Sequence, residues 1–282
     1  MDVAASVFVK VRELPDSVFA AISARLSHYT IGFIRLTPSS QGDQPQLLGS
    51  GVLVKADSVH AVLTTAHVLP LLPTSGKLCV LLEPTPQPHV VDTIGLEYRS
   101  VAHGSVDAEG PDLAAVILAP SIASSLAAKK SFYNLDRWRD TALQAPGDVH
   151  DGVWAVQGWL NERTQVIENF HTHERTTRFY NFTGLGGPDP STSRDGYDYF
   201  DFVYERTNPD VTPQRWGGVS GGGLWQIPLK RDGDSITDVK ALLRGIAFYQ
   251  AEQTGAPFSI RCHGIQSVYD RAYSTIAGST AV

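Results

Sequence analysis

The residue in this sequence best surrounded for nucleophilic chemistry is Ser220. It lies in the stretch WGGVSGGGLW (216–225), in which five of the ten residues are glycine. Glycine adopts positive φ angles readily and lets another segment of chain approach closely. A nucleophilic serine needs an exposed hydroxyl, room for a substrate carbonyl, and backbone N–H groups that can hold an oxyanion. Ser220 is therefore a candidate nucleophile, the alternative being a glycine-rich turn with an incidental serine.

A serine of this kind needs a general base, and His67 is the upstream candidate. It follows the strand-like run VLTTA (62–66) and precedes Val68 and Leu69. We expect a strand to deliver the imidazole at its end, where a short helical turn begins. Rigid backbone would then fix the ring at the rim of a barrel and leave it open to a cleft. The alternative is a hydrogen-bonded histidine at a strand end with no part in chemistry.

The third candidate is Asp112, which is the only charge at the head of the apolar run Leu113–Leu118. A carboxylate in such a place must be paired or hydrogen-bonded, because burying a bare charge is too costly. We expect Asp112 to orient the imidazole. The alternative is a turn aspartate that caps its own loop.

The elements that must position these residues are short β-rich runs separated by turn residues. The first series covers Tyr29–Leu36, Gln46–Val54, Val59–Thr65, Leu78–Leu82, Val90–Leu96 and Leu113–Leu118. The second series covers Gly152–Trp159, Val166–His173, Thr177–Phe182, Tyr197–Tyr204, Gly222–Pro228 and Ala241–Tyr249. Because no βαβ alternation is visible, the pattern predicts a mainly all-β fold with two six-stranded antiparallel β-barrels.

Helical spacing marks both ends of the chain. Apolar residues recur at this spacing after Asp16 and again between 268 and 276, which predicts an N-terminal and a C-terminal helix. Residues 119–146 are alanine-rich and charged, and we expect one or two short helices there. Residues 184–193 are rich in Gly, Pro and Ser, which predicts a long loop.

These elements divide the chain into five expected parts. They are an N-terminal extension with a helix (1–28), a first barrel with His67 and Asp112 (29–120), a helical connector (121–146), a second barrel with Ser220 (147–265), and a C-terminal helix and tail (266–282).

Composition excludes several function classes. The net charge is −6 and the sequence pI about 5.8, so no basic surface favours nucleic acid. No apolar run approaches the roughly 20 residues that cross a bilayer, and the first residues show no secretory signal. Only two cysteines are present, Cys79 and Cys262. We therefore expect a reducing, cytoplasmic setting with no membrane or nucleic-acid partner.

No cofactor or metal site is predicted. His171 and His173 share a strand face beside Glu174, but further ligands are missing and a solvated face is favoured. The glycines at 184–187 lack the spacing of a dinucleotide motif. Cys262 and His263 are adjacent in sequence, whereas a catalytic thiol and its base meet in space, so we interpret them as structural.

The three candidates occur in the order His, Asp, Ser, separated by 45 and 108 residues. In this order, and in the motifs Thr65-Ala66-His67, Asp112-Leu113-Ala114 and Gly218–Gly222, the chain resembles the chymotrypsin/trypsin-like serine peptidases. Weaker similarities lie at Gly49–Val54, Val156–Trp159 and Gly245–Ala247. The resemblance spans about residues 30–277, and the absence of a disulfide framework is like that of intracellular, bacterial-type members.

What the resemblance implies is a serine endopeptidase that cleaves protein or peptide substrates without a cofactor. Ser220 would attack the scissile carbonyl, His67 would take and return its proton, and Asp112 would hold the imidazole. The backbone N–H groups of Gly218 and Ser220 would form the oxyanion hole.

Departures from the family pattern concern activation and specificity. Val219 stands where secreted members carry the aspartate that pairs with a new N-terminus, so we expect no maturation by N-terminal insertion. Phe248 and Tyr249 replace a usual Ser-Trp pair, so a hydrogen bond to Asp112 is expected to be absent or supplied elsewhere. Gln250 replaces a glycine and would narrow the specificity pocket, near whose base the alignment places Gln214. The candidate substrate-binding residues are therefore Gln214, Tyr249 and Gln250.

A peptidase that is not made as an inactive precursor needs another means of limiting its activity. We expect narrow substrate choice, or a regulatory protein partner that orders the loops near 184–196 and 206–217. A bacterial stress or phage-defence setting is an extension of this hypothesis.

Two rival functions stay open. The first is an α/β-hydrolase-type esterase that uses Ser220, Asp238 and His263. These residues occur along the chain in the order Ser, Asp, His, which is the order of the catalytic residues in that fold. Against it, residues 213–216 are polar where a buried strand is needed, and only 62 residues follow Ser220. The second is a catalytically silent peptidase-like module that binds a protein without cutting it.

Overall fold

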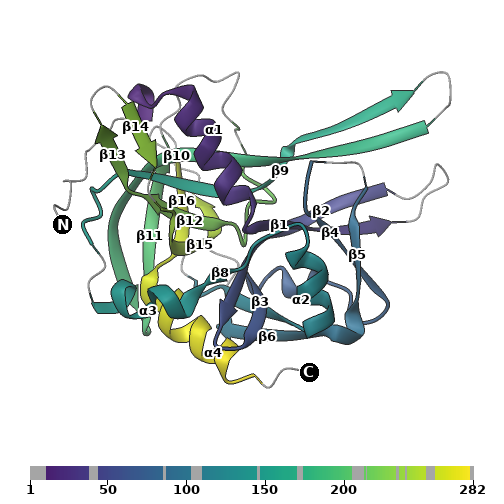
Figure 1. Cartoon of the computed structure of the whole chain (residues 1–282). Helices are drawn as coiled ribbons and strands as arrows, with labels where there is room; N and C mark the ends of the chain where they lie inside the picture. Colours follow the sequence, from purple (N-terminus) through teal and green to yellow (C-terminus); the bar gives the residue numbers. More distant parts are fainter. Residues whose placement is uncertain are drawn as a thin grey trace.

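The computed structural model describes residues 11–37, 44–84, 87–102, 110–144, 147–169, 174–204, 213, 215–232, 235–238, 240–251 and 258–279. The chain is mostly β and is built on two sheets, with short helices at the N-terminus, between the sheets and at the C-terminus (Figure 1). The predicted fold class, mainly β with an N-terminal and a C-terminal helix, is confirmed. Of the two predicted six-stranded barrels, the second is a closed six-stranded barrel, whereas the first is an open sheet that curls into a half-barrel.

The first sheet curls around its own apolar core. Its strands are β1 (Thr30–Thr37), β2 (Gln44–Ala56), β3 (Val59–Thr64), β4 (Lys77–Leu81), β5 (His89–Asp92), β6 (Leu96–Ala102) and β7 (Leu113–Leu118), in the order β5-β4-β1-β2-β3-β7-β6. All neighbours in this order are antiparallel, while the two-residue β8 (Tyr133–Asn134) pairs parallel with β2. The sheet is open, with β5 and β6 as its two edge strands, and it curls into a half-barrel.

One predicted strand of this sheet is divided in two. The run Val90–Leu96 is interrupted by the 3-10 turn η3 (Thr93–Gly95), so it contributes to both β5 and β6. The carboxylate of Asp92 accepts a hydrogen bond from the Ile94 N–H at 3.0 Å, which stabilises the turn.

The second sheet closes into a six-stranded barrel. Its strands are β9 (Val153–Asn169), β10 (Glu174–Arg194), β11 (Tyr197–Tyr204), β12 (Gly223–Ile227), β15 (Leu242–Ala251) and β16 (Phe258–His263), and every pair of neighbours is antiparallel. Strands β13 (Leu229–Asp232) and β14 (Ser235–Asp238) form a separate hairpin. Figure 1 shows β9 and β10 continuing together beyond the body of the molecule as a long arm.

Two expectations for the second sheet were wrong. Residues 184–193 form part of β10 and not a loop, since Gly186 pairs with Trp154 of β9 and with Tyr204 of β11. A Cβ at Gly186 would overlap the Val203 carbonyl oxygen, so glycine here permits close approach of strands. Strand β16 was missed although its sequence alternates, with Arg261 between the buried residues Ile260 and Cys262. Residues 170–173 of the predicted strand Val166–His173 lie outside the described residues.

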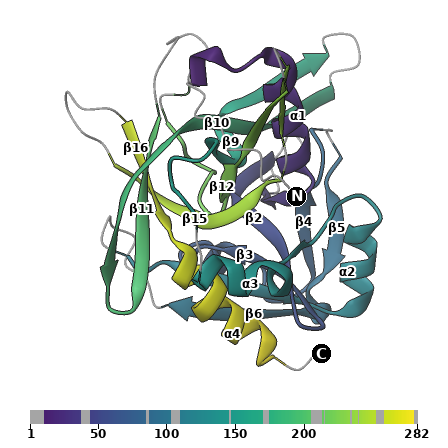
Figure 2. The same cartoon turned by 60° about the vertical axis from the view of Figure 1, so that its left-hand side comes forward.

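The expected helices are present. Helix α1 (Asp16–Ser27) packs through Ile22 and Leu26, and the connector holds α2 (Pro120–Ala127) and α3 (Leu135–Gln144). The C-terminal helix begins as a π-helical segment, η4 (Ser267–Ala272), and continues as α4 (Tyr273–Ala277). Figure 2 shows α3 lying beside it. Two further 3-10 turns are η1 (Val11–Glu13) and η2 (Leu69–Leu71). In the described part of the chain, no helix is long and apolar enough to cross a membrane.

One apolar core joins the two sheets, and Trp225 of β12 lies within it. Its fully buried ring stacks on Tyr29 at 5.5 Å between centroids and meets the edge of Tyr133 at 5.3 Å. Tyr29 immediately precedes the first sheet, and Tyr133 belongs to β8, which pairs with β2 of that sheet. Trp225 therefore connects the second barrel to the first sheet through direct aromatic contact.

Trp225→Ala should lower the free energy of unfolding by about 3–5 kcal/mol, because it removes a buried aromatic ring and leaves a cavity between the sheets. Trp225→Phe should cost much less, since a ring remains and the indole N–H, which has no partner in the described residues, is removed. Urea unfolding measures both values. Trp138→Ala, on a partly exposed face of α3, is the control. If Trp225→Ala and Trp138→Ala lowered the free energy of unfolding equally, the role of Trp225 in connecting the two sheets would be contradicted.

Candidate active site

The structure brings His67 and Asp112 together. His67 follows the end of β3 and Asp112 immediately precedes β7, and these two strands are paired. The His67 ring Nδ1 lies 2.5 Å from Asp112 Oδ2, and the His67 backbone N–H donates to Oδ1 at 3.0 Å. The carboxylate side chain is 2% exposed and the imidazole 26%. Asp112 is thus a buried carboxylate with both oxygens bonded to one histidine, not a turn cap.

This geometry fixes the tautomer of His67. An ionised carboxylate only accepts hydrogen bonds, so Nδ1 carries the proton that is donated to Asp112. In the neutral ring the lone pair is then on Nε2. The partly exposed imidazole can therefore accept a proton at Nε2 while Asp112 stabilises the cation that forms.

A second histidine, His263, holds the backbone of Asp112. Its Nε2 accepts a hydrogen bond from the Asp112 N–H at 2.9 Å. The ring is fully buried, and its nearest aromatic neighbours are Phe248 at 4.7 Å and Tyr199 at 5.3 Å. Burial lowers the pKa of His263 to about 4, against the attraction of nearby carboxylates. The ring is therefore neutral near pH 7, which is the form that can accept this bond.

Sequence analysis missed this role of His263. The role depends on β16, which was not predicted, and the only local signal was the pair Cys262-His263. Phe248 cannot donate the side-chain hydrogen bond to Asp112 that the family pattern has at this position. Asp112 is held by other bonds instead: His67 binds its carboxylate and His263 binds its backbone N–H. His263 is a poor general base for Ser220, since it is buried and its Nε2 is occupied.

The loop that carries Ser220 is held by Ser50 of β2. The Ser50 N–H donates to the Ser220 carbonyl at 2.8 Å, and its hydroxyl donates to the Gly218 carbonyl at 2.7 Å. The same hydroxyl accepts from the Trp159 N–H at 2.8 Å, and the Ser50 carbonyl accepts from the Thr64 hydroxyl at 2.8 Å. One fully buried serine thereby ties the first sheet to β9 and to the Ser220 loop.

Glycines let this loop lie against the segment that carries His67. A Cβ at Gly49 of β2 would lie 2.7 Å from Val68 Cγ2 and 3.2 Å from the Ser220 carbonyl oxygen. Val68 directly follows His67, so the Ser220 backbone and the histidine segment meet on either side of Gly49. Gly221 has a φ of +89°, and a Cβ there would overlap a carbonyl oxygen of β2. Only glycine fits this close approach.

The direction of the Gly218 backbone N–H is set by the carbonyl of Gly217. The carbonyl of Gly217 accepts a hydrogen bond from the Asn161 N–H at 2.8 Å. In a trans peptide the C=O and the following N–H point in opposite directions. The Gly218 N–H therefore points away from Asn161, and its φ of +93° is one that glycine tolerates.

The N–H of Ser220 is oriented in the same manner. The Val219 carbonyl accepts from the Gly222 N–H at 2.7 Å, so the Ser220 N–H of the same peptide points out of that turn. Within the part of the chain that the structure describes, neither the Gly218 nor the Ser220 N–H has a hydrogen-bond partner. These two donors are free to bind an oxyanion beside a partly exposed Ser220.

The predicted substrate-binding residues have different outcomes. Gln214 lies outside the described residues. Tyr249 and Gln250 are on β15 and partly buried. The Gln250 side-chain oxygen accepts a hydrogen bond from the Trp216 N–H at 2.7 Å, so this residue links β15 to the Ser220 stretch. Trp216 in turn packs edge-to-face on Phe182 at 5.0 Å.

Among the described residues, no group of three or more His, Cys, Asp or Glu side chains is placed to hold a metal ion. His171 and His173 lie outside those residues. Comparison with models of protein families and with curated proteins finds no match for this chain.

Ser50→Ala should lower the free energy of unfolding by about 2 kcal/mol or more, because the Gly218 carbonyl and the Trp159 N–H each lose a partner in a buried place. Amide hydrogen exchange in the Ser220 loop should also become faster. Urea unfolding and exchange mass spectrometry measure these effects. Ser100→Ala, which removes a bond within its own strand region, is the control. Unchanged exchange in the loop would contradict the role of Ser50.

His263 should make the protein less stable as the pH falls. Its folded-state pKa of about 4 lies below the ordinary 6.5, so between these values the unfolded chain binds a proton that the folded protein does not. The free energy of unfolding should therefore be unaffected above pH 6.5 and fall towards pH 4, on the order of 1 kcal/mol per pH unit. Urea unfolding from pH 7 to 4.5 should show a smaller slope for His263→Gln. The exposed His28→Gln is the control, and a slope unchanged by His263→Gln would contradict this assignment.

Proposed function

We propose that this protein is a serine endopeptidase in which Ser220 is the nucleophile, His67 the general base and Asp112 the group that orients it. The observation that carries the proposal is the buried Asp112 carboxylate, which binds the ring and the backbone of His67 with separate oxygens. The N–H groups of Gly218 and Ser220, which have no hydrogen-bond partner in the described residues, support it, since they lie on the loop that packs beside the histidine segment.

In this mechanism His67 Nε2 takes the proton from the Ser220 hydroxyl as its oxygen attacks the scissile carbonyl carbon. The tetrahedral oxyanion accepts hydrogen bonds from the Gly218 and Ser220 N–H groups. The imidazolium, stabilised by Asp112, gives its proton to the leaving amine. Water then attacks the acyl-enzyme by the same route and releases Ser220.

The resemblance to the chymotrypsin/trypsin-like peptidases is part of this proposal. Two β units, one closed and one curled, are compatible with it. Val219 is 2% exposed and packs among apolar residues of the second barrel, so the loop has no carboxylate there to pair with a terminal ammonium. Ser50 supplies an alternative means of holding the loop, which supports activity without N-terminal insertion.

The esterase alternative is weakened by the fold. In an α/β-hydrolase the nucleophile lies on a turn from a strand into a helix. Here Ser220 leads into strand β12, and His263 is buried with its Nε2 bonded to Asp112. The side chain of Asp238 lies outside the described residues. No specific observation favours this function or the silent binding module.

Compartment and control are further parts of the proposal. Cys79 and Cys262 are both buried and form no disulfide, which suits a reducing cytoplasm. We expect a protein or peptide substrate, with activity limited by narrow specificity or by a regulatory protein partner. The first expected control loop (184–196) is formed by β10 and the turn that follows it, so that expectation was wrong. Residues 206–212 and 214 of the second expected loop (206–217) lie outside the described residues.

A fluorophosphonate probe should label the folded protein at Ser220 and fail to label Ser220→Ala. His67→Gln should slow labelling by about 10²–10⁴-fold, because general-base catalysis contributes this much. Asp112→Asn should also slow it strongly, since the wrong tautomer of His67 is then favoured. Mass spectrometry of the labelled peptide gives the site and the rate.

His28→Gln, an exposed histidine, should label at the wild-type rate. Absence of labelling in folded wild type would overturn the proposal and favour a binding module. Labelling at Ser220 that is insensitive to His67→Gln would also contradict it. Cleavage of an unfolded protein substrate by wild type and not by Ser220→Ala distinguishes a peptidase from an esterase.

A further inference from the structure

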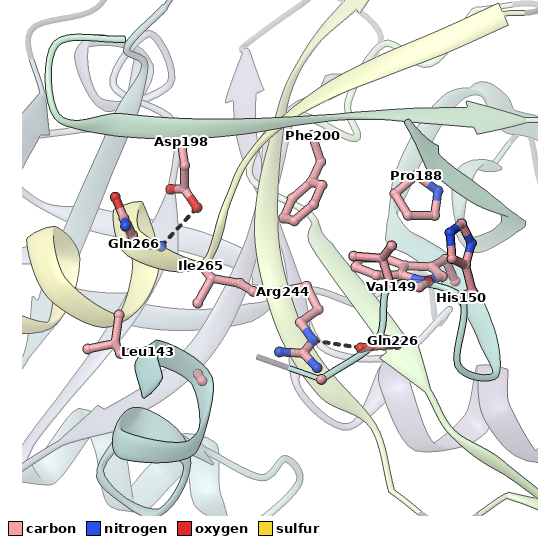
Figure 3. A pocket seen from close by; sticks show the side chains of 13 residues that line it. Leu143, Val149, His150, Pro188, Asp198, Phe200, Gln226, Arg244, Ile265 and Gln266 are labelled. Carbon is pink, nitrogen blue, oxygen red and sulfur yellow. Dashed lines mark hydrogen bonds between the residues drawn. The ribbon is translucent and has the colours of Figure 1, made fainter. Parts of the chain in front are cut away.

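A cavity of about 440 Å³ opens at the end of the second barrel, between its strands and the end of helix α3. Strands β9, β11, β12 and β15 contribute Trp154, Phe200, Gln226 and Arg244 to its wall. Figure 3 shows Phe200, Gln226 and Arg244 around this space. Its size is within the usual range for small-molecule sites.

This cavity is separate from the Ser220 site. Gln226 is near the far end of β12, whose first residue follows Ser220 by three positions. On β15, Arg244 lies three residues before Ala247, whose carbonyl accepts from the Gly221 N–H. At about 3.3 Å per strand residue, the two places are about 10 Å apart along β15.

The guanidinium of Arg244 is the main charge in this wall. The residue is 5% exposed, and its Nε donates to the Gln226 side-chain oxygen at 2.8 Å. The Gln226 amide is itself fixed, because it donates to the carbonyl oxygens of Asp148 and Asp151 at 2.7 and 2.9 Å. Arg244 is therefore held in one place by a neutral partner.

The rest of the guanidinium is unsatisfied. An arginine has five N–H donors, and in the described residues Arg244 has no ion pair and no hydrogen bond besides that to Gln226. Burial lowers the pKa of Arg244 from its ordinary value, because the charged form is partly desolvated. An anion bound beside this guanidinium would stabilise its charge.

Asp198 also lines the cavity, yet it does not supply this anion. Its Oδ1 accepts from the Ser267 N–H and hydroxyl, both at 2.8 Å, and its Oδ2 accepts from the Gln266 N–H at 3.0 Å. The carboxylate thus caps the start of the C-terminal helix, as the dashed line to Gln266 in Figure 3 indicates. Its charge is stabilised there and not by Arg244.

The remaining wall is largely apolar. Trp154 and Phe200 lie 5.5 Å apart between ring centroids, and Leu143, Val149 and Ile265 surround the same space. A ligand that fits must therefore combine an anionic group with an apolar body.

We propose that this cavity binds a small organic anion, with its carboxylate or phosphate on the Arg244 guanidinium and its apolar body against Trp154 and Phe200. Both acid groups match the guanidinium by paired hydrogen bonds. The inference uses no property of Ser220, so its test is independent of the proposed peptidase activity.

Titration calorimetry with phenyl phosphate, benzoate and inorganic phosphate tests it on the full chain with Ser220→Ala. We expect saturable 1:1 binding of phenyl phosphate or benzoate, and the tighter of the two identifies the acid group. Arg244→Met should weaken that binding at least tenfold. Exposed Arg137→Met should leave it unchanged.

Leu143→Trp keeps the charge and fills apolar space, so it should also abolish binding, and it serves if Arg244→Met does not fold. No saturable binding of either organic anion at 10 mM would overturn the proposal. Equal affinity of the parent, Arg244→Met and Leu143→Trp would do the same. Inorganic phosphate binding as tightly as phenyl phosphate would refute the apolar part of the site.

Discussion

The hydrogen bonds of Ser50 are the constraint on which the candidate site depends. Its backbone and hydroxyl fix the carbonyls of Ser220 and Gly218, and these bonds cross from the first sheet to the second. The directions of the Gly218 and Ser220 N–H groups are set within that loop by the carbonyls of Gly217 and Val219, which accept hydrogen bonds from the Asn161 and Gly222 N–H groups. Ser50 on the first sheet therefore holds the loop in place, and bonds of the loop itself and of Asn161 orient the possible oxyanion donors.

A similar principle holds for Asp112. Burying a carboxylate at the head of an apolar strand is unfavourable unless its oxygens are bonded, and His67 bonds both. His263 then holds the aspartate backbone, and it does so only as a neutral ring, which its burial ensures. The two histidines therefore differ in what they can do. The partly exposed ring of His67 is suited to transfer a proton, and the buried ring of His263 is suited to hold the backbone of Asp112.

Local patterns predicted the fold class and the candidate residues, because strand runs and the flanks of His67, Asp112 and Ser220 are visible in short stretches of sequence. They could not reveal Ser50 or His263, whose partners lie more than 100 residues away. The same limit explains the error at 184–193, where glycines that usually indicate a loop instead permit pairing with two neighbouring strands. The role of a side chain whose partners are distant in sequence cannot be predicted from the residues that flank it.

The most direct measurement of the central claim is a crystal structure of the protein after reaction with a fluorophosphonate. The account predicts phosphorus bonded to Ser220 Oγ, with one phosphoryl oxygen about 3 Å from the backbone nitrogens of Gly218 and Ser220. It also predicts His67 Nε2 beside the modified oxygen and Nδ1 still on Asp112. A phosphoryl oxygen turned away from both nitrogens, or phosphorus on another residue, would contradict it.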